Sequence, residues 1–388
     1  MIGAARGLRA NSGATREFLG SKRPGVIGAI RGPVMRGAVM RAAATLAAAA
    51  CAGLLCSATV MSAPAYAEAA SPSRAARLGP FGPEGPRLRE QLWLLPGGDP
   101  QNPLRATVFR PADEPGAGGD AARRPLVVIN HGTSDATRLA VAMPVYYWLS
   151  RWFVERGYVV LLPQRRGHGA TGGTLAESIG TCADPDHYRS GLAAADDIEA
   201  AIDYISREPF IAPGQAIVVG ISSGGWASLA LASRNPANVR AVVNIAGGRG
   251  GRPWDSDPER AVCGERRLLE AAHSYGVSAR LPTLWLYAAN DSLFRPELAR
   301  GLAAAWQDGG GQAELHIFPP YGADGHNLAD DRAGWDVWGP AMDRFLAAAH
   351  APAIAATTPS LPAPGAEAGD APADSFAAAV SVEGAGDQ

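Results

Sequence analysis

Ala216-Ile-Val-Val-Gly-Ile-Ser-Ser-Gly-Gly225 joins an apolar run to a turn that carries serine between glycines. The run 216–221 is typical of a buried strand, and the residues from Trp226 onward favour a helix. A tight strand-to-helix turn of the pattern G-x-S-x-G needs glycine on either side of the serine, and it exposes the hydroxyl above the end of the strand. The stretch therefore predicts Ser222 as a nucleophile. Ser223 is the other serine available, but its place in the pattern makes its backbone N–H a donor to an oxyanion.

Working outward, apolar runs alternate with segments of helical periodicity along most of the chain. The expected strands cover 92–95, 106–109, 126–129, 158–162, 216–221, 239–245, 283–288 and 314–318, and the expected helices include 145–156, 193–207 and 296–307. Continuous apolar strands that alternate with helices are typical of an α/β fold with a mostly parallel central sheet and helices on both faces. In such sheets ligands bind at the carboxyl ends of the strands, where Ser222 lies.

A serine nucleophile needs a base that removes its proton and a carboxylate that orients the base. After a turn of this kind the acid and then the histidine follow the serine along the chain. Asp291 comes directly after the strand expected at 283–288, and His326 lies in the loop after 314–318. Asp324 is the alternative acid, but it belongs to the same loop as His326.

Two backbone N–H groups from separate loops can stabilise the oxyanion of a tetrahedral intermediate. His131-Gly132-Thr133 follows the strand expected at 126–129, so we expect Thr133 and Ser223 to supply these donors. His131 then braces the loop and is not the base.

The chain resembles an α/β-hydrolase of the dienelactone-hydrolase-like group over residues 87–349. The motifs that carry the resemblance are His131-Gly132, Arg166-Gly-His-Gly169, Gly220-Ile-Ser-Ser-Gly-Gly225, Asn290-Asp291 and Gly325-His326. Dienelactone hydrolases proper have cysteine at the position of Ser222, so their lactone substrate does not carry over. The same motifs are similar to the catalytic domain of prolyl-oligopeptidase-like serine peptidases, although the segment before residue 87 is too short for a propeller.

These observations predict an enzyme that cleaves a carboxylic ester through an acyl-enzyme intermediate. A serine peptidase or amidase acting on short peptides is the alternative, and a non-catalytic binding protein on the same fold is the third hypothesis. No metal-ligand spacing or phosphate-binding loop occurs, so no cofactor or metal is expected. The formal charge of -2 and the pI near 6.4 disfavour nucleic acid as a partner.

The first 67 residues have the features of an export signal. They hold eight basic residues and one acid, an uncharged stretch at 42–61, and Ala65-Tyr-Ala67, which suits a signal peptidase. We therefore expect cleavage after Ala67, a periplasmic or secreted protein, and no stable membrane span after cleavage. A membrane anchor at 42–61 is the alternative, and the start codon is open because Met35 or Met40 would give a more compact signal.

The remaining chain divides into three expected parts. A linker covers 68–86, the catalytic domain 87–350, and a disordered tail 351–388, which is rich in Ala and Pro and has five acids and no base. The oligomeric state is not predicted.

Cys182 and Cys263 are the cysteines left after signal cleavage, and both follow strands on the catalytic edge of the sheet. In an oxidising compartment we expect them to form a disulfide, with free buried thiols as the alternative. Nearby aromatic and basic side chains are candidates for the substrate pocket, although core packing or structural ion pairs explain them equally well. The aromatic candidates are Tyr146, Trp226 and Trp254, and the arginines are Arg165, Arg166 and Arg249.

Overall fold

The computed structural model describes residues 77–112, 123–133, 137–251 and 262–349. All of these lie in the compact unit Ala70–Gln388. The expected signal peptide with its cleavage site after Ala67, the tail 351–388 and Trp254 lie outside the described residues. Within the described part, no helix is long and apolar enough to cross a bilayer.

The described residues form a central sheet of nine strands, with strand order β1-β2-β3-β5-β4-β6-β7-β8-β9. Its strands are β1 (Gly79–Phe81), β2 (Gln91–Leu95), β3 (Leu104–Phe109), β4 (Leu126–Asn130), β5 (Val159–Gln164), β6 (Ala216–Ile221), β7 (Val239–Ile245), β8 (Thr283–Ala288) and β9 (Ala313–Phe318). Pairing is antiparallel from β1 to β5 and parallel from β5 to β9. The expected mostly parallel α/β sheet is confirmed.

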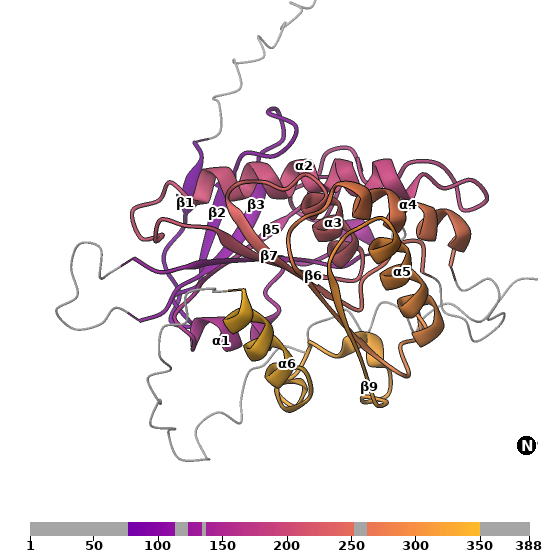
Figure 1. Ribbon diagram of the computed structural model, residues 1–388. Coiled ribbons are helices and arrows are strands. Elements are labelled where there is room, and N and C mark those ends of the chain that lie inside the picture. Colours follow the sequence, from indigo (N-terminus) through magenta and orange to yellow (C-terminus); the bar gives the residue numbers. More distant parts are fainter. Residues whose placement is uncertain (1–76, 113–122, 134–136, 252–261, 350–388) are drawn as a thin grey trace, which may run out of the picture. The chain divides into compact units, whose positions relative to one another are not determined.

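Helices cover both faces of this sheet (Figure 1). The helices are α1 (Tyr147–Val154), α2 (His187–Ile205), α3 (Ser223–Ala232), α4 (Glu265–Ser278), α5 (Pro296–Asp308) and α6 (Gly334–Ala348). Residues of α2 to α5 pack against one face, and residues of α1 and α6 pack against the other. Alternate side chains of β6 point to opposite faces of the sheet, so Val218 packs with the helices on the first face and Ile217 with those on the other.

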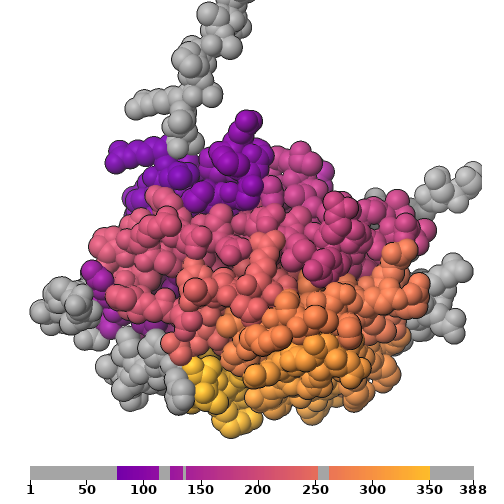
Figure 2. Space-filling view, turned by 45° about the horizontal axis from the view of Figure 1, so that its top comes forward, coloured from indigo at the N-terminus to yellow at the C-terminus, as the bar shows by residue number. Residues whose placement is uncertain are grey.

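The two edges of the sheet come from opposite ends of the described chain. In the space-filling view, the early strands in indigo and the C-terminal segments in orange lie on either side of the middle of the chain (Figure 2). The inner strands β4, β5, β6 and β8 are buried along their whole length, whereas β9 is mostly half-buried. A strand buried on both faces favours apolar residues at most positions, which explains their apolar runs, although β4 ends in the buried Asn130 and β5 in the buried Gln164.

Several elements differ from the sequence-based expectation. β1 lies inside 68–86, the range expected as a linker, and pairs with β2, so the sheet begins before residue 87. α2 begins at His187, earlier than expected, because the Asp186 carboxylate accepts a hydrogen bond from the Arg189 N–H at 2.8 Å. The sequence did not predict α4 or α6.

Candidate active site

Ser222 stands on a strained turn between β6 and α3. Its φ of 54° and ψ of -124° are unusual for a residue with a side chain. A Cβ at Gly220 would collide with the carbonyl of Gly224, and a Cβ at Gly224 would collide with the carbonyl of Asn130. The glycines of the motif therefore allow β4, β6 and α3 to approach closely enough to hold the Ser222 hydroxyl at the carboxyl edge of the sheet.

A carboxylate and an imidazole lie together at the same edge. Nδ1 of His326 is 3.1 Å from Oδ1 and 3.2 Å from Oδ2 of Asp291. Asp291 follows β8, and His326 lies in the short helix η4 (Gly325–Asn327) after β9. The Asp291 Oδ1 also accepts hydrogen bonds from the backbone N–H groups of Leu293 at 2.9 Å and Phe294 at 2.8 Å, which fixes the orientation of the carboxylate.

Asp324, the alternative acid, has a different set of contacts. Its carboxylate accepts hydrogen bonds from the backbone N–H groups of Ser292 and His326 and from the Ser292 hydroxyl. The structure thus brings Asp291, and not Asp324, against the imidazole of His326 through side-chain hydrogen bonds.

The other ring nitrogen of His326 has no hydrogen-bond partner among the described residues. The expected contact between Nε2 and the Ser222 hydroxyl is therefore not a hydrogen bond in this structure. Catalytic hydrogen bonds are commonly long without substrate and tighten when it binds. Both side chains are nearly buried, at 6% exposure for Ser222 and 5% for His326.

Charge around His326 favours its protonated form. Burial alone would lower the pKa of His326, but the Asp291 carboxylate opposes this through its charge and hydrogen bond, and Asp324 and Asp330 add to the effect. The net result is a pKa above the ordinary value for histidine. This imidazole is suited to take a proton and hold it while the negative Asp291 stays beside it.

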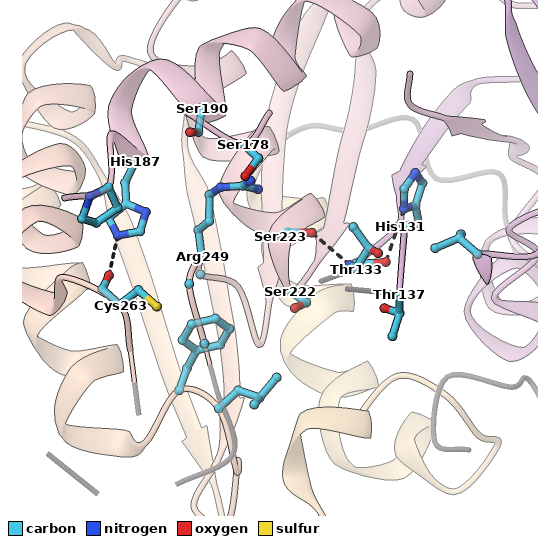
Figure 3. A pocket seen from close by; sticks show the side chains of 18 of the residues that line it. His131, Thr133, Thr137, Ser178, His187, Ser190, Ser222, Ser223, Arg249 and Cys263 are labelled. Carbon is cyan, nitrogen blue, oxygen red and sulfur yellow. Dashed lines mark hydrogen bonds between the residues drawn. The ribbon is translucent and has the colours of Figure 1, made fainter. Parts of the chain in front are cut away.

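The two expected oxyanion donors lie next to each other. The Thr133 N–H donates a hydrogen bond to the Ser223 hydroxyl at 3.0 Å (Figure 3). A Cβ at Gly132 would come within 2.7 Å of the Ser222 Cβ. The loop after β4 therefore lies close to the turn between β6 and α3 that carries Ser222, which we call the elbow. A substrate oxygen bound to the Thr133 N–H would take the place of the Ser223 hydroxyl.

His131, the first residue of this loop, is fixed by contacts with Arg165. Its Nε2 accepts a hydrogen bond from the Arg165 N–H at 3.1 Å, and the Arg165 guanidinium donates to the His131 carbonyl at 2.8 Å. Burial, and secondarily the positive charge of Arg165, holds the pKa of His131 well below its ordinary value. A neutral histidine fixed by these contacts is suited to brace the loop, as the sequence predicts.

A pocket of about 380 Å³ opens beside the elbow and is lined by Ser222 and Ser223 (Figure 3). Tyr146 lines it, and its hydroxyl accepts a hydrogen bond from the Gly132 N–H at 3.0 Å. The prediction that Trp226 belongs to the pocket is wrong. The Trp226 side chain is 1% exposed, packs against Tyr275 in the core, and donates to the His187 carbonyl at 2.9 Å.

The three arginine candidates have different surroundings. Arg165 is fully buried, and its guanidinium binds Glu177 through hydrogen bonds of 2.6 and 3.1 Å, so it is structural. Arg166 forms an ion pair with Asp197 at 3.0 Å. Arg249 lines the pocket and also lies 3.5 Å from Glu177.

The chain is similar to known proteins at two levels, a protein family and individual proteins. The model of the dienelactone hydrolase family matches residues 141–350, a range that contains the elbow, the carboxylate and the imidazole. The chain belongs to this family.

One curated relative and several solved structures resemble this dienelactone hydrolase family member. Dipeptidyl-peptidase 5 of Porphyromonas endodontalis is 25% identical over an alignment of 195 residues, and the match covers 45% of this chain and 26% of the relative. An acylaminoacyl peptidase of Pyrococcus horikoshii is 16% identical with a TM-score of 0.49, covering 66% of this chain and 41% of that chain. A putative dienelactone hydrolase of Klebsiella pneumoniae is 17% identical with a TM-score of 0.44, covering 67% of this chain and 98% of that chain. The chain thus spans about a quarter of the dipeptidyl-peptidase and two fifths of the acylaminoacyl peptidase.

The pocket of this family member has walls that the sequence alone did not indicate. The segment 141–145, between η2 (Arg138–Ala140) and the predicted Tyr146, lines one side, and His187 lines another. The His187 ring donates a hydrogen bond from Nε2 to the Cys263 carbonyl at 2.7 Å (Figure 3). The apolar run from Val141 to Val145 was the available signal, but it contains a proline and has neither strand nor helix periodicity.

The expected disulfide is present between Cys182 and Cys263, and both residues line the pocket. It joins the loop before α2 to the segment before α4, across a sequence separation of 81 residues. The bond therefore restrains the unfolded chain and one wall of the pocket at once.

Replacing both cysteines by serine is expected to lower the free energy of unfolding by about 4 to 5 kcal/mol, the loop-entropy value for a closure of this length. Because the bond forms a wall, KM should rise more than kcat falls. Urea unfolding and steady-state kinetics measure the two effects, with reductant-treated unmutated protein as the control. Two titratable thiols in the native, unreduced protein would contradict the assignment.

Proposed function

We propose that the protein is an exported serine hydrolase that cleaves a carboxylic ester through an acyl-enzyme intermediate. Ser222 is the nucleophile, His326 the general base and acid, and Asp291 the residue that orients the imidazole. The observation that carries the proposal is the strained backbone of Ser222 at the carboxyl edge of the sheet. Ser222 lines a pocket of about 380 Å³, and the Asp291–His326 pair lies at the same edge of the sheet.

The reaction begins when the Ser222 oxygen attacks the ester carbonyl and His326 Nε2 takes the hydroxyl proton. Nδ1 of His326 keeps its proton toward Asp291, whose negative charge stabilises the imidazolium. The Thr133 and Ser223 N–H groups bind the oxyanion in place of the ground-state contact between these two residues. Collapse of the intermediate expels the alcohol, which receives the proton from His326, and water then repeats the sequence to release the acid.

The family is named for a lactone, which is a cyclic ester, so an ester is the substrate class that we propose, although that lactone itself does not carry over to a serine at position 222. The similarity to dipeptidyl-peptidase 5 supports the second candidate, a peptidase or amidase acting on short peptides. Export is supported by the disulfide, because such bonds persist in oxidising compartments.

A substrate screen separates the two candidates. We expect turnover of p-nitrophenyl acyl esters of increasing chain length, little turnover of aminoacyl and prolyl anilides, and neither activity with Ser222→Ala. Turnover of the anilides alone would replace the ester proposal by the peptidase. Ester and anilide turnover that both persist in Ser222→Ala would reject the nucleophile.

The rate should depend on pH through His326. The base must be neutral to take the serine proton, and its pKa is raised, so kcat/KM is high above this pKa and falls as the pH drops through it. The midpoint is therefore expected above 6.5, the ordinary histidine value. Initial rates measured at the isosbestic wavelength of p-nitrophenol test this, and a midpoint below 6.5 would speak against His326 in this environment.

A further inference from the structure

Two loops at the carboxyl edge of the sheet are joined by hydrogen bonds from one side chain of each loop. The acid loop, residues 289–294, follows β8 and contains Asp291. The base loop, residues 319–327, follows β9 and contains His326. The side chain of Asn290, in the acid loop, binds the base loop, and the side chain of Asp324, in the base loop, binds the acid loop.

Asn290 binds the backbone at the start of the base loop. Its Oδ1 accepts a hydrogen bond from the Tyr321 N–H at 2.7 Å, and its Nδ2 donates to the carbonyls of Tyr321 at 3.1 Å and Gly322 at 3.3 Å. The backbone carbonyl of Asn290 also accepts from the Gly325 N–H at 3.2 Å. This one residue thus contacts the base loop at three positions.

Asp324 binds both loops at once. Its Oδ1 accepts from the Ser292 N–H at 3.0 Å and from the His326 N–H at 2.9 Å, and its Oδ2 accepts from the Ser292 hydroxyl at 2.6 Å. Ser292 is the neighbour of Asp291 in the chain. The carboxylate therefore ties the backbone next to the acid directly to the backbone of the base.

The position of the base loop explains why such a tie is needed. Among the described strands β9 is the last in the sheet, so its loop has a neighbouring described strand on one side only, which is β8. Gly325 allows the close approach, because a Cβ there would lie 2.6 Å from the Asn290 Oδ1 and 2.6 Å from the Ala288 Cβ. Side-chain contacts from the acid loop replace the support that a further strand would give.

We propose that Asp324 is a positioning residue that sets the place of the His326 imidazole against Asp291 and, through it, against Ser222. This inference rests on the proposed function of these three residues. Asp324 is not among the residues that line the pocket, and its hydrogen bonds go to Ser292 and to the backbone of His326. It acts by holding the two loops at one separation, and small displacements of a catalytic group are costly, at about 100-fold in rate for about 1 Å.

The charge of Asp324 has a second measurable effect, on the pH dependence of kcat/KM. Within the described part of the chain, the carboxylates of Asp291, Asp324 and Asp330 each raise the pKa of the His326 imidazole. Removing the charge at Asp324 while keeping its shape lowers this pKa, so the acidic limb of kcat/KM moves to lower pH. A residue with only a general role in stability would not move this limb.

The experiment compares three variants of the full chain with p-nitrophenyl butyrate, with rates normalised to the folded fraction from circular dichroism. Asp324→Ala loses all three contacts and should lower kcat about 100-fold with KM changed less than about threefold. Asp324→Asn keeps an oxygen for the two N–H groups, so it should recover most of this loss and shift the limb to lower pH. Ser292→Ala loses only the hydroxyl contact and should resemble the unmutated protein within about fivefold.

A kcat of folded Asp324→Ala within twofold of the unmutated protein would overturn the proposal. If that variant does not fold, an unmoved acidic limb in Asp324→Asn would overturn it instead. Ser222→Ala separates this failure from failure of the proposed function. Turnover that persists in Ser222→Ala rejects the nucleophile, whereas an inactive Ser222→Ala beside a fully active Asp324→Ala rejects the positioning role alone.

Discussion

Asp291→Asn is expected to lower kcat about 10⁴-fold, as loss of the correct histidine tautomer does in other serine hydrolases. The Oδ1 of Asp291 accepts N–H donors from Leu293 and Phe294, so the carbonyl of an asparagine must occupy that place. Its NH₂ group then faces Nδ1 of His326 from the position of Oδ2, 3.2 Å away. A donor there competes with the oxygen at the Oδ1 position, 3.1 Å from Nδ1, and favours the tautomer with the imidazole proton on Nε2, where the base must be free to accept one.

The matched control for this substitution is Asp324→Asn, which alters the alternative acid two residues before His326 in the chain. We expect Asp324→Asn to retain most of its activity, with kcat well above that of Asp291→Asn. Steady-state kinetics on both variants, with thermal unfolding to verify that both fold, make the comparison. The reverse order of activities would assign the orienting carboxylate to Asp324.

Ser222→Ala is expected to lower kcat about 10⁶-fold, the loss found when the nucleophile of a serine hydrolase is removed. The residue at this position has a φ of 54°, and alanine tolerates it no worse than serine, so the fold should persist. The variant retains the pocket and the Asp291–His326 pair, and it should bind substrate with little change in affinity. Stopped-flow measurement with an acyl ester should show no burst of alcohol.

Ser223→Ala is the control for this loss because the two serines are adjacent and both line the pocket. The substitution removes a hydroxyl that accepts from the Thr133 N–H, but it retains the backbone N–H proposed as an oxyanion donor. Its effect should stay below the loss of about 10²- to 10³-fold that follows removal of such a donor. Loss of activity in Ser223→Ala together with an active Ser222→Ala would exchange the two roles.

The elements that position the site could be predicted from sequence because their signals are local. β6 and β8 are buried along their whole length, so their apolar runs are continuous, and polar residues follow at the sheet edge, Ser222 directly after β6 and Asn290-Asp291 one residue beyond the end of β8. The glycines beside Ser222 have one physical reason, which is the close approach of neighbouring backbones. The chain order of the serine, carboxylate and imidazole follows from the order in which the strands occur.

The remaining features depend on contacts that have no local signal. All of α3 is buried, so its sequence has no polar face, and nothing in it shows that Trp226 points into the core and not into the pocket. α6 begins with a glycine and contains Pro340, and both residues are unfavourable inside a helix, so its sequence does not predict one. The helix is held in place by packing, because Trp338, Met342 and Phe345 are buried against the sheet. The hydrogen bonds of Asp324 join residues from two loops, whereas the sequence offered this residue only as an alternative acid, ranked second because it lies in the loop of His326.

The most direct test of the proposed nucleophile is covalent labelling. The folded protein is treated with a fluorophosphonate, digested, and analysed by mass spectrometry to locate the modified residue. We predict one label per chain, on Ser222, with loss of esterase activity in proportion to labelling and no reaction of Ser222→Ala. A label on Ser223 or elsewhere, or an active protein that does not react, would contradict Ser222 as the nucleophile.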